Sequence, residues 1–491
     1  MNILSVASEA VPFAKTGGLA DVAGALPGAL ARLGHRMVTV MPLHRKVDKA
    51  RHGLKSTGRI VSAQVGGHTH IGAIWMTEQG GAETYFIEHD LFFDRDGLYG
   101  EGGDSYGDNA ARFAFFSQAA LDLCGAIGFA PDVIHCHDWQ TALVPVYLRE
   151  RPGAYPDAER AGTVLTIHNL AYQGVFGFRD WPALELPDHA FSIDGLEYHG
   201  AINLLKGGMK YAHAITTVSR TYAREIQTPA FGYGLDGVAR FRAADLHGIV
   251  NGIDTALWDP AHDPALSQPF SADAIDGRAA NRELLRHSLG LSDGAGPIIG
   301  MVGRLAEQKG LNLLLDALDG LMRRDVRLVI LGEGDPAIMR ALERAAAHHG
   351  GRLRLHAGFD EGTARRIYGG CDLFLMPSAF EPCGLAQLIA MRYGALPVVH
   401  RVGGLADTVI PYGSEPLHAT GFAFDHFTPE ALLACLDTAL EVFRHGDVFR
   451  RLQRNAMGRD VSWAASAKGY VDVYRTVAQR AGAVPSGAAR G

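Results

Sequence analysis

The sequence contains few cysteines, and their spacing excludes two common uses of this residue. Five occur in 491 residues, namely Cys124, Cys136, Cys371, Cys383 and Cys435. An odd, scattered set without a C-x-x-C pair argues against a disulfide framework and against a zinc site. We therefore expect all five side chains to be reduced thiols.

Long apolar runs and basic clusters are also missing. No stretch approaches the ~18 apolar residues that suggest a membrane-spanning helix. The segment Met1–Glu9 has no basic leader of the kind that opens a secretory signal. The formal net charge is −7 and no long run of Lys or Arg occurs, which argues against nucleic-acid binding. We expect a cytoplasmic protein without membrane or nucleic-acid partners, in which a few local cations bind any small anionic ligand.

Short β-branched runs alternate with helical patterns along the chain, which predicts an α/β fold with parallel sheets covered by helices. The expected strands are Ile3–Ala7, Met37–Met41, Val133–His137 and Thr163–His168 in the first half, and Ile298–Val302, Arg327–Leu331, Leu353–Ala357, Leu373–Met376 and Leu396–His400 in the second. The length allows two or three domains at roughly 150 residues each.

A segment rich in Pro, Asp and Ser separates the two groups of strands. It runs from Asp259 to about Asp276, and we place a hinge near residues 250–280. The expected domains are residues 1–250 and 251–460, facing each other across a deep cleft. Residues 461–480 are expected to form a helix that packs back on the first domain, and the tail 481–491, poor in apolar side chains, is expected to be mobile.

Unusual polar segments follow the expected strands. Ligands bind at the carboxyl ends of the strands in open parallel sheets, so these segments are candidates for a functional site. They are Lys15–Asp21, His137–Trp139, His168-Asn169, Gly303-Arg304, Gln308–Gly310 and Phe380–Leu385.

The segment Lys15-Thr16-Gly17-Gly18-Leu19 lies where a strand gives way to a helix. Glycines allow a ligand to approach the backbone closely, and both the helix N-terminus and the lysine favour an anion. Taken alone, the same five residues are also compatible with a glycine-rich turn that carries a solvated lysine.

Arg304 and Lys309 flank a loop between the strand Ile298–Val302 and an expected helix at Asn312–Leu321. Preorganised cations at this place would stabilise a departing diphosphate, whose negative charge grows in the transition state. The spacing by itself carries no information, because surface Arg and Lys are common. The position after a domain-opening strand is what supports the hypothesis.

Asp138 and Glu381 are carboxylates that follow strands in different expected domains. Such a pair leaves open a hydrolase with a general acid and a nucleophile, because the sequence does not give their separation.

Two further patterns favour a structural interpretation. Gly332–Ala337 satisfies the dinucleotide pattern G-x-G-x-x-A, with Asp360 downstream, but it does not follow a first strand. His135 and His137 share one face of a strand and could ligate a metal, yet no third ligand accompanies them.

Taken together, the motifs resemble those of bacterial glycogen synthases and plant starch synthases, from Met1 to about Tyr474. The matching segments, in order, are Lys15–Asp21, His135–Trp139, Thr166–Gly174, Val250–Asp254, Arg304 with Lys309, Phe380–Leu385 and Gly403–Val409.

The resemblance implies the GT-B fold, in which two Rossmann-like domains hold the acceptor mainly on the first and the nucleotide sugar mainly on the second. It implies transfer of glucose from ADP-glucose to the non-reducing end of an α-1,4-glucan such as glycogen, with retention of configuration and without a metal or other cofactor. UDP-glucose as donor remains open. So do a glucan phosphorylase, which would need a lysine-bound pyridoxal phosphate, and a catalytically silent glucan-binding protein.

The resemblance also assigns roles to individual residues. Lys15 would reach the donor phosphates across the cleft, Arg304 and Lys309 would neutralise the diphosphate, and Glu381 would hold the transferred glucose. The implied catalytic set is Glu381, Arg304, Lys309, His168 and Asp138, and the implied substrate-binding set is Lys15, Gly17, Gly18, Asp21, Asn251, Cys383, Gly384, Leu385, Tyr99 and Phe359. Tyr99 is expected near the sugar and Phe359 against the nucleotide base.

One departure concerns the wider class of retaining transferases, which often carry a second glutamate eight residues after the first. This chain has Ile389 at that position. Glycogen synthases resemble it in lacking that glutamate, so the departure points to this subfamily.

Overall fold

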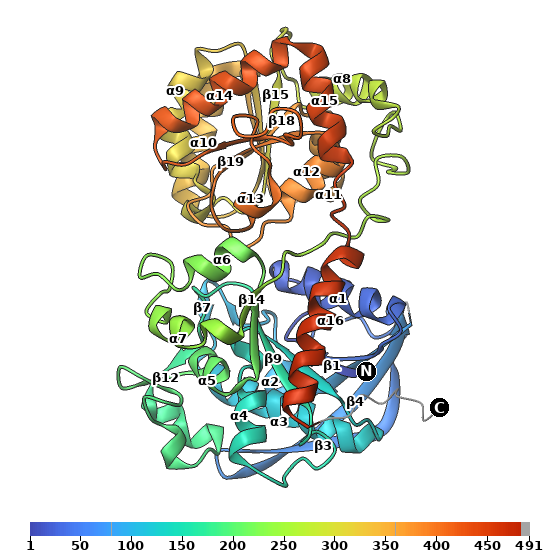
Figure 1. The fold of residues 1–491 in the computed structure, drawn as a ribbon, viewed down its shortest axis with the longest axis vertical. Helices are drawn as coiled ribbons and strands as arrows, with labels where there is room; N and C mark the ends of the chain where they lie inside the picture. Colours follow the sequence, from blue (N-terminus) through green and yellow to red (C-terminus); the bar gives the residue numbers. More distant parts are fainter. Residues whose placement is uncertain (80, 359, 483–491) are drawn as a thin grey trace. The chain divides into compact units, whose positions relative to one another are not determined.

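The structure is a computed structural model that describes residues 1–79, 81–358 and 360–482 (Figure 1). It divides into two units. The first comprises Met1–Val218, Ala223–Ile249 and the described segment that begins at Trp463; the second comprises Ser219–Tyr222 and Val250–Ser462.

The first unit is built on a nine-stranded sheet with the order β14-β13-β9-β8-β1-β2-β5-β4-β3. Its strands are β1 (Asn2–Val6), β2 (Arg36–Pro42), β3 (Lys55–Val65), β4 (His68–Gln79), β5 (Ala82–Glu88), β8 (Val133–His137), β9 (Gly162–Ile167), β13 (Ala214–Thr217) and β14 (Leu246–Gly248). The strands from β14 to β5 pair in parallel, whereas β4 and β3 add an antiparallel edge. The central strands are apolar and buried, as expected for parallel strands covered on both faces.

Helices cover this sheet. They are α1 (Gly18–Arg32), α2 (Asp90–Phe93), α3 (Asn109–Ile127), α4 (Leu143–Glu150), α5 (Leu204–Tyr211), α6 (Arg220–Glu225, which begins in the second unit), α7 (Asp236–Phe241) and α16 (Trp463–Arg480). The C-terminal helix α16 packs on α1 and β9, and Figure 1 shows it in red along the sheet. Its buried face carries Trp463, Tyr470, Tyr474 and Val477, which join the core of this unit.

Small sheets and turns complete the first unit. The strands are β6 (Gly100–Glu101), β7 (Asp104–Ser105), β10 (Val175–Phe176), β11 (Glu197–Tyr198) and β12 (Ala201–Asn203), and the 3-10 turns are Trp139–Thr141, Phe178–Leu184, Asp188–Ala190 and Ala243–Asp245.

The second unit has a six-stranded parallel sheet with the order β17-β16-β15-β18-β19-β20. The strands are β15 (Ile298–Val302), β16 (Arg327–Gly332), β17 (Leu353–Ala357), β18 (Leu373–Met376), β19 (Leu396–His400) and β20 (Phe422–Phe424). The helices are α8 (Arg278–Ser288), α9 (Leu311–Met322), α10 (Pro336–His349), α11 (Glu361–Gly370), α12 (Ala386–Arg392), α13 (Gly403–Thr408), α14 (Pro429–Arg444) and α15 (Gly446–Met457), with 3-10 turns at Ile275–Gly277, Glu307–Lys309 and Gly350–Arg352. One apolar core joins this sheet to its helices.

Most strand predictions are confirmed to within one residue, and two need correction at their ends. The expected strands Ile3–Ala7 and Thr163–His168 stop at Val6 and Ile167. His168 leaves the ladder because its backbone N–H donates to the Asp138 carboxylate instead of a neighbouring strand.

Two predictions fall on residues that the structure does not describe, and a third concerns membrane-spanning helices. The expected mobile tail lies, from residue 483 onward, outside the described residues, as does Phe359. Within the described ranges, no helix combines the length and the apolar character that crossing a membrane requires.

Candidate functional site

In the first unit, the predicted site residues gather after three neighbouring strands. Lys15, Gly17, Gly18 and Asp21 follow β1, Asp138 directly follows β8, and His168 directly follows β9. Because β1 pairs with β8 and β8 with β9 in parallel, the carboxyl ends of all three strands lie at one edge of the sheet. The predicted residues of this unit thus follow strands that end at one edge of the sheet, and their role in a common site stays a prediction.

Asp138 is held in an unusual backbone conformation. Its φ angle is +56°, in the left-handed region that non-glycine residues rarely adopt. Its N–H donates to the carbonyl of Thr166 at 2.9 Å, and its Oδ1 accepts the N–H of His168 at 2.7 Å. Such strain persists where the surroundings enforce it and is concentrated at functional sites.

Burial raises the pKa of the Asp138 carboxyl to about 8, an effect that the nearby Glu9 increases. Backbone N–H groups that donate to this carboxylate act in the opposite direction and do not cancel the cost of burial. Near neutral pH, Asp138 is therefore mainly protonated in the unliganded protein and can donate a hydrogen bond.

This raised pKa predicts that stability falls as the pH rises. The unfolded chain releases the proton near the ordinary value of 3.8, whereas the folded protein keeps it up to about pH 8. The folded state thus binds more protons between these values, so the free energy of unfolding decreases across that window. In wild type, we expect the free energy of unfolding to fall by on the order of 3 kcal/mol between about pH 5 and about pH 8. Asp138→Asn should not show this fall. Denaturant titrations measure both.

The exposed Asp273 provides the control for this experiment. Asp273→Asn should keep the wild-type dependence of stability on pH. Equal pH dependence in wild type and Asp138→Asn would show that Asp138 is already ionised in the folded protein at neutral pH.

His168 is positioned by a second buried histidine. Its Nε2 lies 3.0 Å from Nδ1 of His137, and Nε2 of His137 lies 3.4 Å from Oγ of Ser5. Burial lowers the pKa of both imidazoles, so both are neutral near pH 7. One nitrogen of this pair must donate and the other accept, which fixes the tautomers relative to each other.

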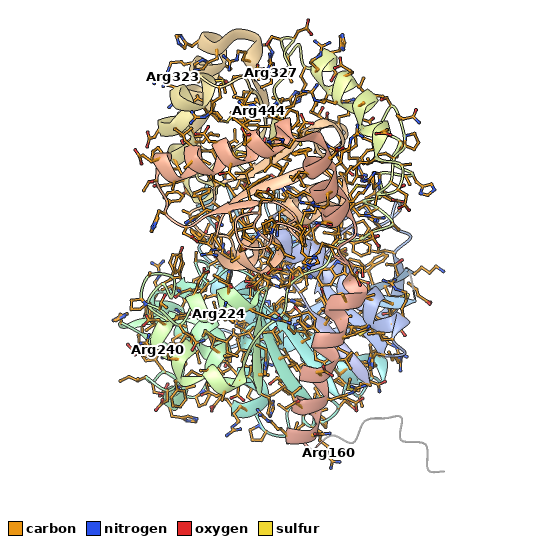
Figure 2. The ribbon with its side chains drawn as sticks, turned by 45° about the horizontal axis from the view of Figure 1, so that its top comes forward. Arg160, Arg224, Arg240, Arg323, Arg327 and Arg444 are labelled. Atoms are coloured by element: carbon orange, nitrogen blue, oxygen red, sulfur yellow. The ribbon has the colours of Figure 1, made fainter. Side chains whose placement is uncertain are left out.

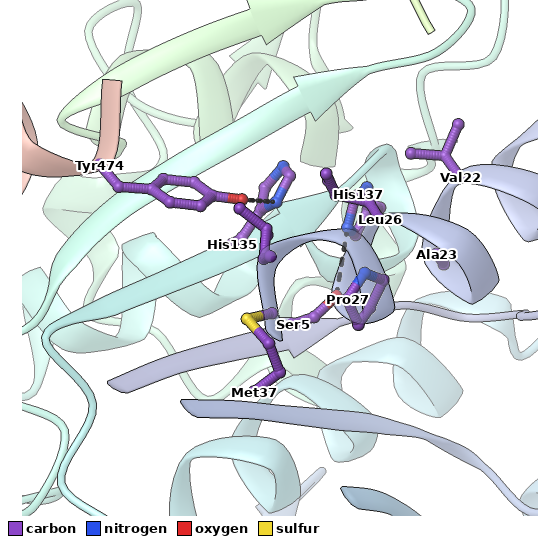
Figure 3. A pocket seen from close by; sticks show the side chains of 10 residues that line it. Ser5, Val22, Ala23, Leu26, Pro27, Met37, His135, His137 and Tyr474 are labelled. Carbon is purple, nitrogen blue, oxygen red and sulfur yellow. Dashed lines mark hydrogen bonds between the residues drawn. The ribbon is translucent and has the colours of Figure 1, made fainter. Parts of the chain in front are cut away.

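The third histidine, His135, is a structural residue. Its Nδ1 lies 2.8 Å from the hydroxyl of Tyr474 in α16 (Figure 3). Its Nε2 lies 2.5 Å from Oγ1 of Thr166. The space around it, between α1 and the sheet, is too tight to admit a water molecule. Among the described residues, no group of three or more His, Cys, Asp or Glu side chains could hold a metal. These observations favour the structural interpretation of the histidine pair on β8.

The Lys15–Asp21 segment leaves its glycines unobstructed. A Cβ added at Gly17 or Gly18 would meet no atom within 4 Å, so packing does not require glycine at either position. Gly17 precedes α1 and provides no side-chain cap to the N–H groups of the first turn. Lys15 is half exposed and pairs with Asp21 at 2.7 Å. Open backbone, uncapped amides and a lysine suit the binding of an anion.

Tyr99 belongs to the same cluster. Its hydroxyl lies 2.7 Å from Oγ of Ser8, and burial raises the pKa of this phenol, with Glu9 and Asp138 adding to the effect. The structure thus places Tyr99 beside the two buried carboxyls.

In the second unit, the buried carboxylate of Glu381 forms an ion pair with the partly exposed Lys309. Nζ of Lys309 lies 2.6 Å from Oε2 of Glu381, and the same oxygen accepts the hydroxyl of Ser378 at 3.1 Å. Glu381 is 6% exposed, so its carboxylate is oriented by charged and polar partners in a largely desolvated place. The sequence did not single out Ser378, although it lies only a few residues before Glu381.

Glycines fix the loop that carries Glu381. The N–H of Gly404 donates to the carbonyl of Glu381 at 3.0 Å, and a Cβ at Gly403 would lie 2.0 Å from that carbonyl oxygen. Gly403 also has a φ of +44°. These two glycines therefore serve close packing of α13 against the Glu381 loop. Gly384, with a φ of +74°, permits the turn into α12, which begins after Leu385.

Arg304 lacks the carboxylate partner that some other exposed arginines have within the described part of the chain. Arg240 and Arg444, labelled in Figure 2, pair with Asp236 at 2.7 Å and Glu441 at 2.9 Å. Arg304 is exposed, makes no ion pair with any described residue, and contacts Gln308 at 3.3 Å. Its charge is available to an anionic ligand.

Asn251 and Cys383 lie together beside this loop. The thiol of Cys383 is fully desolvated, which raises its pKa to about 12, and it receives a hydrogen bond from the Asn251 backbone. Oδ1 of Asn251 is buried without a hydrogen-bond partner among the described residues. A buried acceptor of this kind is costly unless a ligand satisfies it.

The glycine pattern Gly332–Ala337 has a packing explanation. A Cβ at Gly332 would lie 1.9 Å from the carbonyl oxygen of Gly303, and one at Gly334 would lie 2.3 Å from that of Leu305. Asp335 caps α10, which begins at Pro336. The glycines thus allow two loops of this unit to pack together, and the dinucleotide interpretation loses its support.

Comparison with known proteins identifies the family of both halves of the chain. The starch synthase catalytic domain matches residues 2–241, and the glycosyl transferases group 1 family matches residues 283–450. A glycogen synthase of Syntrophotalea carbinolica is 48% identical over 476 residues, covering 97% of this chain and 98% of the relative. A glycogen synthase of Anaeromyxobacter dehalogenans is 49% identical over 480 residues, covering 97% of this chain and 100% of the relative.

Solved structures show the same relationship. The catalytic domain of starch synthase IV from Arabidopsis thaliana, bound to ADP and acarbose, has a TM-score of 0.90 and 34% identity, covering 97% of this chain and 99% of that one. A sucrose-phosphate synthase from Thermosynechococcus elongatus, with a TM-score of 0.60 and 17% identity, shares the fold and covers 98% of this chain and 99% of that one. The two Rossmann-like domains expected for GT-B are thereby confirmed. The chain belongs to the glycogen and starch synthase family of retaining GT-B glycosyltransferases.

Proposed function

We propose that this glycosyltransferase transfers glucose from ADP-glucose to the non-reducing end of an α-1,4-glucan with retention of configuration. The observation that carries the proposal is the Lys309–Glu381 ion pair with Ser378, which presents a buried, oriented carboxylate beside a cation. The family supports the glucan product, and the ADP bound to the Arabidopsis relative supports the adenine nucleotide.

In the proposed mechanism, Glu381 accepts hydrogen bonds from the transferred glucose and stabilises positive charge that develops at its anomeric carbon. Arg304 and Lys309 stabilise the departing diphosphate, and in the first unit Lys15 and the first amides of α1 are assigned to donor phosphate. The 4-hydroxyl of the acceptor attacks from the face that the diphosphate leaves, and a leaving phosphate oxygen takes its proton. Retention follows without a covalent glycosyl-enzyme intermediate.

We assign to the donor Asn251, Cys383, Gly384 and Leu385. We assign Asp138 to the acceptor side, and we place His168 and Tyr99 near the reacting sugar. The unpartnered Oδ1 of Asn251 supports contact with a sugar hydroxyl. The protonated carboxyl of Asp138 supports a hydrogen bond to a sugar oxygen. A cytoplasmic location completes the proposal, and the five cysteines, all buried free thiols, fit a reducing compartment.

The direct test of this function is incorporation of labelled glucose into glycogen. We expect ADP-glucose to support rapid incorporation and UDP-glucose to support little. Equal use of UDP-glucose would refute the nucleotide assignment, and incorporation that requires glucose 1-phosphate and a pyridoxal cofactor would indicate a phosphorylase instead.

Turnover is also expected to be independent of added metal. Lys15, Arg304 and Lys309 supply the positive charge that a divalent cation provides in many nucleotide-sugar reactions. EDTA should therefore leave the rate of glucose transfer unchanged. A loss of activity in EDTA that Mg²⁺ or Mn²⁺ restores would contradict this assignment.

A further inference from the structure

Glu9 is a buried carboxylate that the proposed mechanism does not use. It lies just beyond the end of β1 and is 3% exposed. Oε2 of Glu9 accepts the backbone N–H of Thr16, and both carboxylate oxygens accept its hydroxyl, at 3.0 and 2.9 Å. The whole carboxylate is thus directed at one residue of the neighbouring segment.

Thr16 lies between Lys15 and Gly17, so these hydrogen bonds act on the segment that begins α1. Few other contacts fix the conformation of this segment near Gly17 and Gly18. Gly17 and Gly18 would leave an added Cβ in open space, and Lys15 is half exposed in a surface pair with Asp21. Surface pairs of this kind contribute little to fixing a conformation. The contact with Glu9 joins a buried carboxylate to the exposed Thr16, and it is made of charge-assisted hydrogen bonds, which are stronger.

We propose that Glu9 is a positioning residue that, as a carboxylate, holds the Lys15–Gly18 segment in the conformation that binds the donor diphosphate. The inference rests on the proposed function, because the donor role of Lys15 belongs to that proposal. Glu9 acts through Thr16 and does not itself contact the substrate.

The surroundings of Glu9 make this support sensitive to pH. Burial raises its pKa to about 7, against the hydrogen bonds from Thr16. The charged and titratable groups that face it are Lys15 and Asp21 at the start of α1, Tyr99, and Asp138 at the end of β8. A protonated carboxyl has lost one acceptor oxygen, so it cannot keep all three contacts with Thr16. Above pH 7 the carboxylate of Glu9 therefore makes all its hydrogen bonds to Thr16 and fixes the segment. As the pH falls through 7, these hydrogen bonds are lost in part and the segment is fixed less well.

The test is the kinetics of Glu9→Gln with ADP-glucose and glycogen between pH 6 and pH 9. Glutamine keeps the shape but replaces one acceptor oxygen with an NH₂ group that cannot accept. We expect kcat/KM for ADP-glucose at pH 8 to fall roughly 10- to 100-fold, since small displacements of a positioned group have effects of this size. The KM for glycogen should be little changed. Wild type should show a rising KM for ADP-glucose as the pH falls through 7, and Glu9→Gln should lack this dependence.

Asp122 offers a matched control. Its Oδ2 accepts the N–H of Ser62 at 2.7 Å and the Ser62 hydroxyl at 3.5 Å, the same type of contact between α3 and β3. Asp122→Asn should retain the wild-type KM and pH profile. Thr16→Val, which removes the hydroxyl and keeps the Glu9 carboxylate, should raise the KM for ADP-glucose while retaining the pH dependence.

Three outcomes would overturn the inference. The first is a folded Glu9→Gln protein with wild-type KM for ADP-glucose and wild-type pH profile. The second is a Glu9→Gln protein whose KM for glycogen changes as much as its KM for ADP-glucose. The third applies if Glu9→Gln does not fold, and it is a Thr16→Val protein with wild-type KM for ADP-glucose. A wild-type protein that cannot use ADP-glucose at all would instead refute the proposed function.

Discussion

Glu381→Gln is expected to lower kcat by about 1,000-fold, the effect of removing one preorganised group that stabilises transition-state charge. Glutamine has nearly the same shape but no charge, so it can neither balance Lys309 nor stabilise the developing positive charge on the sugar. Because Glu381 is assigned to the glucose and not to the nucleotide, the affinity for ADP should be nearly unchanged. Steady-state kinetics and calorimetry with ADP measure the two effects separately.

The exposed Glu333, which follows β16, provides a matched control, and Glu333→Gln should keep wild-type activity. The same experiment separates the proposed mechanism from a hydrolase that uses Glu381 as nucleophile. A fluorinated donor should leave no covalent glucose on Glu381 in a mass spectrum. A trapped adduct would overturn the mechanism, and a fully active Glu381→Gln enzyme would overturn the site.

Lys309→Ala is expected to lower kcat by about 100-fold or more, because it removes a cation from the leaving diphosphate. It also leaves the buried Glu381 without its ion-pair partner, 2.6 Å away in the wild type. The kcat of Lys309→Ala, measured with ADP-glucose and glycogen and compared with that of wild type, tests this prediction.

Arg304→Ala should lower kcat by a similar factor, about 100-fold, because it removes the other cation assigned to the leaving diphosphate. Lys468, exposed on α16, supplies the control, and Lys468→Ala should be fully active. Near-normal turnover in Lys309→Ala or Arg304→Ala would remove that residue from the site. The double variant Lys309→Ala/Glu381→Gln should lose less than the product of the two single losses, since the residues act as one unit.

The sequence predicts the parallel core well because buried parallel strands are short and continuously apolar. Ile298–Val302 and Leu396–His400, for example, have the predicted bounds. The antiparallel edge formed by β3 and β4 was not predicted, for the opposite reason. β3 alternates exposed and buried residues, with exposed polar residues along most of its length, and lacks a continuous apolar run. The pattern that identified the other strands is absent there.

The candidate site is predictable where residues directly follow strands, as Asp138 and His168 do. The contacts that support these site residues are not predictable from the sequence, because they depend on residues far apart in the chain. The sequence does not distinguish Gly17 and Gly18, which face open space, from Gly403 and Gly404, which pack against the Glu381 loop. Nor does it show that Glu9 is buried against Thr16, although an acid so close to the end of a first strand is unusual enough to have been a signal.

The central claim, retaining transfer of glucose from ADP-glucose to a glucan, is tested most directly by following the reaction with a short α-1,4-glucan by proton NMR. The account predicts that each ADP released is matched by one new α-1,4-linkage at the non-reducing end, and that no β-linked product and no free glucose accumulate. A β-linkage, or release of glucose in place of chain growth, would contradict it.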